Sequence, residues 1–98
     1  MTEKNNLIFN EIAPRPHNSF HWTIEGCKTS QFHQLVRCVS GLPLGDVSVN
    51  GRWHMENILG QTEAKLSSGY HSSRNYVHEY GKAETKINRK MGHITWEE

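Results

Sequence analysis

The sequence predicts a small α+β fold of one domain's size. Its 98 residues contain one segment with helical periodicity, followed by several short segments with the composition of β-strands. The chain contains no internal repeat, and no apolar run approaches the roughly 20 residues that cross a bilayer. The expected order is therefore a strand, a loop and a helix, followed by several strands.

The composition is that of a small domain with balanced charge. Hydrophobic residues make up 35% of the chain, so we expect a small core, and the formal net charge is +1. Because like charges do not form blocks, we expect no nucleic acid and no membrane as partner. The two cysteines lack CxxC spacing, and the first residues lack the features of a signal peptide, which predicts reduced thiols and a cytoplasmic location.

The first predicted element is a buried strand at 6–10. This short apolar run, NLIFN, follows the polar residues EKNN, which are typical of a turn. A loop at 12–29 comes next, and two prolines exclude a regular helix from its first half. We expect the apolar side chains of the strand to face a core and its end to present the loop.

A helix is predicted after this loop. Its apolar side chains recur at i, i+3, i+4 and i+7, the stripe of an amphipathic helix that faces a core: Phe32, Leu35, Val36 and Val39. Thr29 or Ser30 can accept hydrogen bonds from the first free amides. Gly41 can adopt the left-handed conformation that ends a helix, and Pro43 prevents its continuation.

The rest of the chain favours strands. Val47 and Val49 alternate with polar residues before Asn50–Gly51, which is a two-residue hairpin signal. Residues 61–75 are polar and predict an exposed connection with at most one helical turn. Three further segments are rich in β-prone side chains: 53–59, 76–80 and 91–96.

Residues 10–22, NEIAPRPHNSFHW, form a segment with a high density of polar chemistry, which we call the polar loop. Glu11 follows the predicted strand and could bind Mg²⁺, which prefers carboxylate and phosphate oxygens. It could instead be a surface residue or the partner of Arg15. Arg15 suits a bidentate contact to a carboxylate, bicarbonate or phosphate, or a structural ion pair.

The same loop contains two histidines and two residues that favour turns. His17 and His21 are four residues apart, but the prolines exclude the helix that would place both imidazoles on one face. This spacing argues against a catalytic zinc site. Asn18 and Ser19 are typical of a tight turn, which would satisfy their side chains locally.

Four cations lie in residues 81–90, which we call the basic loop: Lys82, Lys86, Arg89 and Lys90. They form either a solvated basic face or the binding site of a small molecule that carries a phosphate. The charge is too local for a nucleic-acid footprint. From its residues alone, the sequence predicts two polar loops on a small scaffold, with an anion site as the sharper interpretation.

Three strings of the sequence resemble one known family: NEIAPRPHNSFHWTIEGCKTSQF, GLPLGD and YGK…NRKMGHIT. They are similar, in this order, to the C-terminal part of the carboxyaminoimidazole ribonucleotide synthetases, which are ATP-grasp ligases of purine (IMP) biosynthesis. The resemblance covers most of the chain and is weakest at 61–75. It implies the end of an ATP-grasp domain at 1–45 and a truncated, small β-rich C-terminal domain at 46–98.

The resemblance also implies an activity. These enzymes join aminoimidazole ribonucleotide to bicarbonate by way of carboxyphosphate, using ATP and Mg²⁺. The family's Gly-rich phosphate loop, adenine pocket and second acidic Mg²⁺ ligand have no counterpart in this sequence. We therefore expect a fragment of a cytoplasmic, homodimeric enzyme, and we expect the fragment to be inactive by itself.

The resemblance places functional roles on both loops. Asn10 and Glu11 would contact ATP, with Glu11 as the Mg²⁺ ligand. The residues implied to bind bicarbonate and the nucleotide substrate are Arg15, His17, Asn18, Ser19, Lys82 and Arg89. Arg15, His17 and Lys82 would also be catalytic. Two other interpretations are a non-catalytic module that binds small anions and a His-rich metal protein, the latter disfavoured by the histidine spacing.

Overall fold

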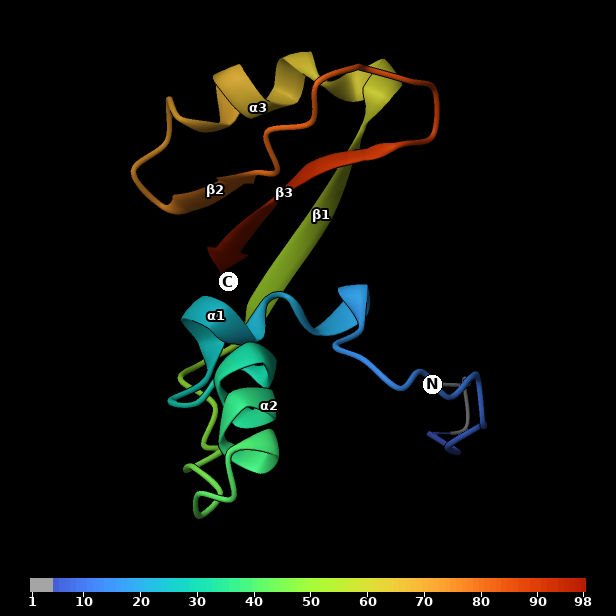
Figure 1. Cartoon of the computed structure of the whole chain (residues 1–98). Helices are drawn as coiled ribbons and strands as arrows, with labels where there is room; N and C mark the ends of the chain where they lie inside the picture. Colours follow the sequence, from blue (N-terminus) through green and yellow to red (C-terminus); the bar gives the residue numbers. More distant parts are fainter. Residues whose placement is uncertain (1–4) are drawn as a thin grey trace.

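The computed structural model describes residues 5–98, and a three-stranded antiparallel sheet organises them (Figure 1). The strands are β1 (Trp53–Leu59), β2 (Asn75–Glu79) and β3 (Lys90–Glu97), in the order β1-β3-β2. The last strand in sequence is thus the central one, with Ile58 opposite Gly92 on one side and Val77 opposite Ile94 on the other. The α+β class and these three strands are confirmed.

One face of the sheet is covered by a helix that the sequence did not clearly predict. After the 3₁₀ turn η2 (Gly60–Thr62), the chain forms α3 (Ala64–Gly69). Leu66 of α3 is 4% exposed and packs with the other buried apolar residues, Ile58, Met91 and Ile94. Most residues of 61–75 are exposed, as expected, but the segment contains a six-residue helix rather than at most one turn, and Leu66 contributes a side chain to the small core.

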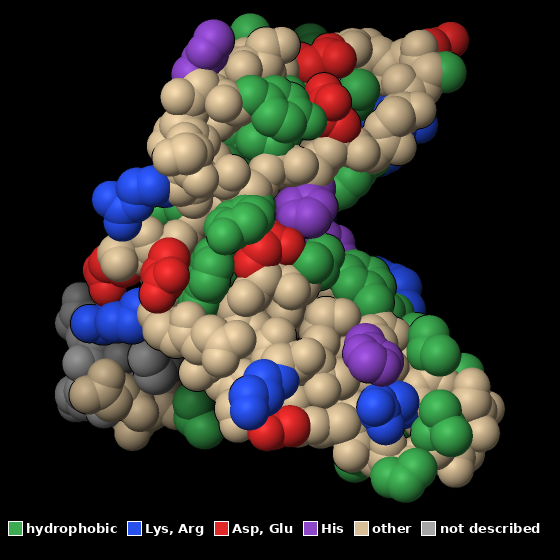
Figure 2. Space-filling model, turned by 90° about the vertical axis from the view of Figure 1, so that its left-hand side faces the viewer, with side chains coloured by type: hydrophobic (Ala, Val, Ile, Leu, Met, Phe, Trp, Pro, Cys, Tyr) green, Lys and Arg blue, Asp and Glu red, His purple; other side chains and the backbone are tan. Residues whose placement is uncertain are grey.

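The first half of the chain forms short helices: η1 (Asn18–Phe20), α1 (Thr23–Gly26) and α2 (Gln31–Val39). The predicted α2 is confirmed. Ser30 Oγ accepts a hydrogen bond from the amide of His33, and Gly41 has a φ of +71° just after the helix. The apolar stripe of α2 is not buried as expected, since Val39 is 76% exposed; hydrophobic side chains lie on the surface of this helical part (Figure 2).

Two other predicted strands do not form. Residues 6–10 have no regular structure, and Phe9 is 75% exposed. The described sheet consists of β1, β2 and β3, so it does not pair with this segment. Val49 makes a single bridge to Cys27 instead of a hairpin across Asn50–Gly51. The reason is that the segment after this turn pairs with β3, which supplies a longer ladder than residues 45–49 could.

Two further features concern the thiols and membrane spans. Cys27 and Cys38 are both free, as expected, and burial raises the pKa of the Cys27 thiol. Because a higher pKa leaves less thiolate at neutral pH, Cys27 is a poor nucleophile.

Within residues 5–98, no helix combines the length and apolar character that a membrane crossing requires.

The two faces of the sheet differ because successive side chains of a strand point in opposite directions. Ile94 faces α3, whereas His93 and Thr95 face the polar loop and α1. Hydrogen bonds join this second face to the first half of the chain at two places: the amides of Asn18 and Asn57 bond to each other (2.9 and 2.8 Å), and His78 bonds to Glu25. The polar loop is thereby held against the sheet.

We predict that Ile58→Ala lowers the free energy of unfolding by about 2–5 kcal/mol, because Ile58 is 0% exposed and the change leaves a cavity. Urea denaturation measures this loss. Ile87→Ala is the matched control: Ile87 is 79% exposed, so the same change should cost less than about 0.5 kcal/mol. Equal losses for the two variants would contradict the observed core.

Candidate functional site

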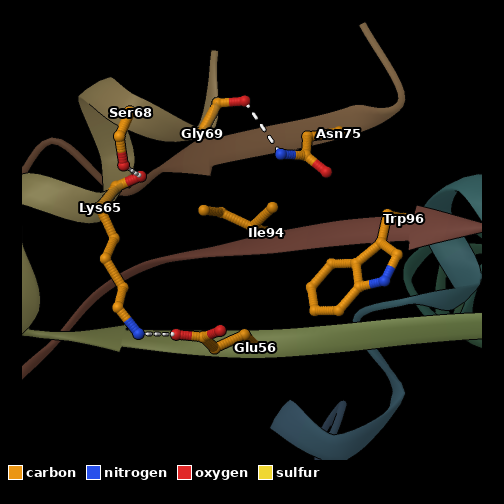
Figure 3. Close-up of a pocket in the computed structure, with 7 residues that line it drawn as sticks. All are labelled: Glu56, Lys65, Ser68, Gly69, Asn75, Ile94 and Trp96. Carbon is orange, nitrogen blue, oxygen red and sulfur yellow. Dashed lines mark hydrogen bonds and ion pairs between the residues drawn. The ribbon is translucent and has the colours of Figure 1, made fainter. Parts of the chain in front are cut away.

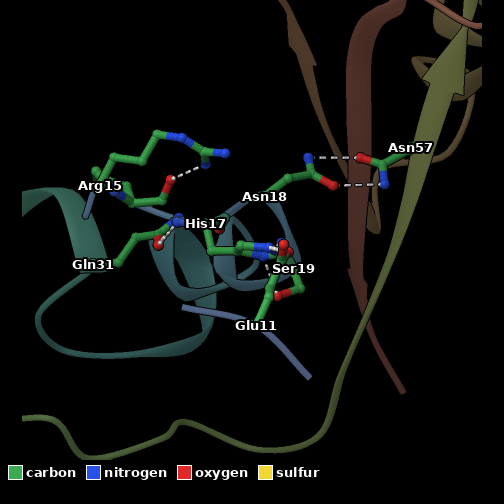
Figure 4. Close-up of polar contacts among 8 residues, drawn as sticks. Glu11, Arg15, His17, Asn18, Ser19, Gln31 and Asn57 are labelled. Atoms are coloured by element: carbon green, nitrogen blue, oxygen red, sulfur yellow. Dashed lines mark hydrogen bonds and ion pairs between the residues drawn. The ribbon is translucent and has the colours of Figure 1, made fainter. Parts of the chain in front are cut away.

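His17 is the centre of the polar loop (Figure 4). The amide of Ser19 donates to His17 Nδ1 (3.2 Å), so this nitrogen acts as an acceptor and Nε2 carries the proton of the neutral ring. Nε2 then donates to the Glu11 carboxylate. The partner of Glu11 among the described residues is therefore His17, and not Arg15 as one interpretation of the sequence had it.

The backbone of the polar loop is held by side chains of the helices. Gln31 Oε1 accepts from the amide of His17, and Gln31 Nε2 donates to the His17 carbonyl, both at 2.9 Å. Thr23 Oγ1 donates to the carbonyl of Phe20 (2.7 Å) and accepts from the amide of Gln31 (3.0 Å). These bonds satisfy the backbone of a loop that prolines keep out of helical geometry.

Arg15 is exposed, and its guanidinium donates to the carbonyl of Pro16 (3.4 Å). Within residues 5–98 it forms no ion pair, which leaves most of its donor fork available to an anion. The pKa of the Glu11 carboxyl is lowered, first by the hydrogen bond to His17 and further by the charges of Arg15 and Lys90. Glu11 is thus ionised at neutral pH.

The side chain of Asn18 is already engaged. Its amide exchanges two hydrogen bonds with Asn57 of β1 (Figure 4). Asn18 therefore ties the polar loop to the sheet in this structure. Asn57 and Gln31 are two residues that sequence reasoning missed, because each lies in another element and 14 or more positions from its partner in the loop.

In the basic loop, the four cations have different surroundings. Lys86 forms an ion pair with Glu84 (3.7 Å), and Arg89 donates to the Glu84 carbonyl (3.1 Å). Lys82 Nζ lies 5.8 Å from the centre of the Tyr80 ring, within the range of a cation–π contact. The charge of Lys90, the first residue of β3, lowers the pKa of Glu11 and of His21. The family resemblance had assigned no individual role to Lys90.

Three imidazoles meet where the sheet contacts the polar loop, and the middle ring, His93, is buried. His93 lies 4.4 Å from His78 and 5.5 Å from His21, measured between ring centres. Burial lowers the pKa of His93 to about 4, and His78 and His21 add to this effect. Burial is also the main cause of a lowered pKa at His21, and the charge of Lys90 lowers it further. Histidine side chains reach the surface at the narrow waist of the molecule (Figure 2).

The chemistry available here suits the binding of an anion. Arg15, Lys82 and Lys90 bring positive charge to the two loops. For a metal, the fit is partial: Glu11 offers a single carboxylate, and no group of three His, Cys, Asp or Glu among residues 5–98 is arranged to hold an ion. A zinc site formed by His17 and His21 is not seen, because the two rings have different partners, Glu11 and Gln31.

A separate pocket lies on the opposite face of the sheet, between α3 and β1 (Figure 3). It contains none of the predicted site residues. Its one cation, Lys65, is paired with Glu56 (2.7 Å), and Trp96 and Ile94 form its apolar side. Because its charge is already neutralised, this pocket is less suited to an anion than the two loops are.

Two family models match the chain. The ATP-grasp domain matches residues 1–32, and the phosphoribosylaminoimidazole carboxylase C-terminal domain matches residues 54–97. The N5-carboxyaminoimidazole ribonucleotide synthase of Bacillus subtilis is 47% identical over 100 residues, which are 98% of this chain and 26% of the relative. The bifunctional purine synthesis protein purC/E of Dictyostelium discoideum is 46% identical over 96% of this chain and 11% of its own length.

Solved structures agree with these matches. An ADP complex of the N5-carboxyaminoimidazole synthetase from Staphylococcus aureus has a TM-score of 0.86 at 40% identity, covering 97% of this chain and 26% of that one. The Aspergillus clavatus synthase, in complex with ADP and 5-aminoimidazole ribonucleotide, has a TM-score of 0.87 at 36% identity, covering 98% of this chain and 28% of that one.

The chain therefore spans about a quarter of the length of the synthases that it resembles. The matches run through both loops and all three strands, and they agree with the order of the motifs in the sequence. On this evidence the chain belongs to the N5-carboxyaminoimidazole ribonucleotide synthase family of purine-biosynthesis ATP-grasp ligases, and it corresponds to the end of the ATP-grasp domain and the C-terminal domain.

Proposed function

We propose that the chain forms the nucleotide-substrate end of a ligase that carboxylates aminoimidazole ribonucleotide with ATP and bicarbonate, by way of carboxyphosphate. The observation that carries this proposal is the exposed guanidinium of Arg15, which forms no ion pair within residues 5–98, in a polar loop where the charge of Lys90 also acts on Glu11. The complex of the Aspergillus clavatus relative with ADP and 5-aminoimidazole ribonucleotide supports the choice of ligand.

In this proposal the loops bind and orient anions. Phosphoryl transfer depends mainly on positioning and on neutralising charge. Arg15 binds bicarbonate through its donor fork, and Lys82 and Arg89 bind the phosphate of the substrate or of carboxyphosphate. His17 keeps its proton on Nε2, where it can orient an oxygen or transfer that proton.

Asn18 and Ser19 complete the substrate-binding set. For the side chain of Asn18 to contact substrate, its amide would have to leave Asn57; in the present geometry it contributes by holding the loop to β1. Ser19 contributes through its hydroxyl, which lies 2.7 Å from His17 Nδ1. Both residues thus act on the position of His17.

Asn10 and Glu11 are proposed to face ATP. Glu11 would give one carboxylate oxygen to Mg²⁺, in exchange for its hydrogen bond with His17. The ion, when bound, neutralises phosphate charge, and its other ligands would be phosphate oxygens, water and groups outside residues 5–98. The lowered pKa of Glu11 keeps the oxygen available at neutral pH.

The remaining parts of the proposal concern the whole enzyme. We place the boundary between the ATP-grasp part (1–45) and the C-terminal domain (46–98) in the segment that links α2 to β1. The enzyme acts in the cytoplasm as a homodimer, and the free thiols of Cys27 and Cys38 support a reducing compartment. A non-catalytic module for small anions is the second candidate, supported by the exposure of Arg15.

We predict that ¹⁵N-labelled chain binds aminoimidazole ribonucleotide, with saturable amide shifts at 15–19 and 82–89 that change when bicarbonate is added. Arg15→Gln should weaken this binding roughly tenfold or more, because a charge-assisted contact is lost. Arg52→Gln, which removes another exposed arginine that pairs with Glu98, is the control and should leave affinity unchanged. Equal affinities of both variants would contradict the site, and equal binding of inorganic phosphate would favour the anion module.

We also predict that the 98-residue chain by itself does not turn over ATP, because Glu11 is the one carboxylate of the polar loop and a single carboxylate does not hold Mg–ATP. A phosphate-release assay with ATP, Mg²⁺, bicarbonate and aminoimidazole ribonucleotide measures this. The same assay with Glu11→Gln is the control for a contaminating ATPase. Turnover by the chain that disappears in Glu11→Gln would show that the prediction is wrong.

A further inference from the structure

His93 is a buried imidazole to which the proposed function assigns no role. It lies near the middle of β3 and is 1% exposed. Its ring is stacked on His78 of β2, with an angle of 21° between the planes, and approaches His21 at the end of the polar loop on another side. It is the middle ring of three, placed where the sheet meets the first half of the chain.

On one side, His93 contacts the start of the basic loop. Its Nδ1 lies 2.7 Å from the hydroxyl of Tyr80, the residue that follows β2. The Tyr80 ring in turn lies below the ammonium of Lys82, and the amide of Tyr80 donates to the Met91 carbonyl of β3 (3.0 Å). The direction of the Tyr80 ring, and with it the surroundings of Lys82, therefore depend on His93.

On the other side, His93 contacts the polar loop through His21. Gln31 Nε2 donates to His21 Nδ1 (2.7 Å), and the same amide group holds both backbone groups of His17. Gln31 thus couples the position of the His21 ring to that of His17. A single imidazole is in contact with the supports of both loops.

We propose that His93 is a positioning residue that holds the polar loop and the basic loop in one arrangement, through His21 on one side and Tyr80 on the other. The inference rests on the proposed function, because it assigns the effect of His93 to the anion site of those loops. It adds to that function a residue that touches neither substrate nor ATP.

The electrostatic setting agrees with this role. The titratable and charged groups around the stack are Glu25 from α1, His17 and His21 from the polar loop, His78 from β2, Tyr80 after it, and Lys90 from β3. Burial and the neighbouring imidazoles disfavour a proton on His93, so the ring is neutral at pH 7. A neutral ring packs between two others without the repulsion that a charged one would meet.

The test compares Tyr80→Phe, His93→Leu and His93→Asn. Tyr80→Phe and His93→Leu each break the same hydrogen bond, so each should shift the amide signals of 80–82 and weaken aminoimidazole ribonucleotide binding about threefold to tenfold. The two changes together should be no worse than His93→Leu alone, because the bond that Tyr80→Phe removes is already lost in that variant. His93→Asn places a polar group near the position of Nδ1 and should restore affinity to within about twofold of the unchanged chain.

Ile58→Val is the control, because it weakens the core on the opposite face of the sheet without touching Tyr80 or His21. It should lower stability and leave affinity unchanged. If His93→Leu weakens binding no more than Ile58→Val, or if its effect adds fully to that of Tyr80→Phe, the inference is overturned. If His93→Leu does not fold, the comparison of Tyr80→Phe with His93→Asn tests the inference instead. Tyr80 is only half-buried, so its substitution is expected to leave the fold intact.

The ligand-free spectra separate this inference from the proposed function. If the unchanged chain does not bind aminoimidazole ribonucleotide, the proposed function is overturned, and the amide signals alone decide the role of His93. Shifts in both 17–21 and 80–82 on His93→Leu, absent in Ile58→Val, support the coupling of the loops. Shifts confined to β3 overturn it.

The pH dependence of stability gives a further prediction. The pKa of His93 is about 4 in the folded chain and near 6.5 in the unfolded one, so the unfolded chain binds more protons between these values. The free energy of unfolding should therefore fall as the pH is lowered from 6.5 to 4. Urea titrations at several pH values measure this fall, and His93→Asn should show less of it. An identical fall in both proteins would contradict the lowered pKa.

Discussion

The double pairing of β3 is the constraint on which the rest of the structure depends. This strand is the last in the sequence, yet it bonds to β1 on one side and to β2 on the other. Without it, β1 and β2 would have no common neighbour among the described residues, and α3 would have no sheet to cover. The core and the junction with the polar loop both use side chains of this strand.

The alternation of β3 gives its two faces different physical roles. Ile94 contributes to a small apolar core with Leu66 of α3, where burial itself stabilises the fold. His93 and Thr95 are just as buried on the other face, where polar groups cost free energy unless they are hydrogen-bonded. His93 Nε2 and Thr95 Oγ1 have no hydrogen-bond partner among residues 5–98. These two buried polar side chains therefore stabilise the fold less than apolar side chains at the same positions would.

The polar loop has a related balance between order and exposure. Prolines prevent helical hydrogen bonds in its first half, so side chains from α1, α2 and β1 satisfy its backbone and amide groups. The cationic end of Arg15 and the carboxylate of Glu11 remain at the surface. A rigid support beneath exposed charged groups is the arrangement expected of a loop that binds a small anion.

Sequence reasoning succeeded where a few neighbouring residues determine structure. The helix α2 followed from the spacing of Phe32, Leu35 and Val36 and from its caps at Ser30 and Gly41, all within one short segment. The strands β2 and β3 followed from local composition, and the long motif strings were sufficient to indicate the family. The candidate residues of the site came from these strings, and their roles stay predictions.

The sequence by itself thus determined the helix, most strands, the family and the polar character of two loops. Only the tertiary structure decided that β1 pairs with β3 rather than forming a hairpin at Asn50–Gly51, that Leu66 is core, and that residues 6–10 form no strand. It also decided that Gln31 and Asn57 bond to the polar loop and that His93 packs against His21. The physical reason is that these contacts join residues far apart in the chain, and their geometry depends on sheet register and packing, which no local pattern encodes.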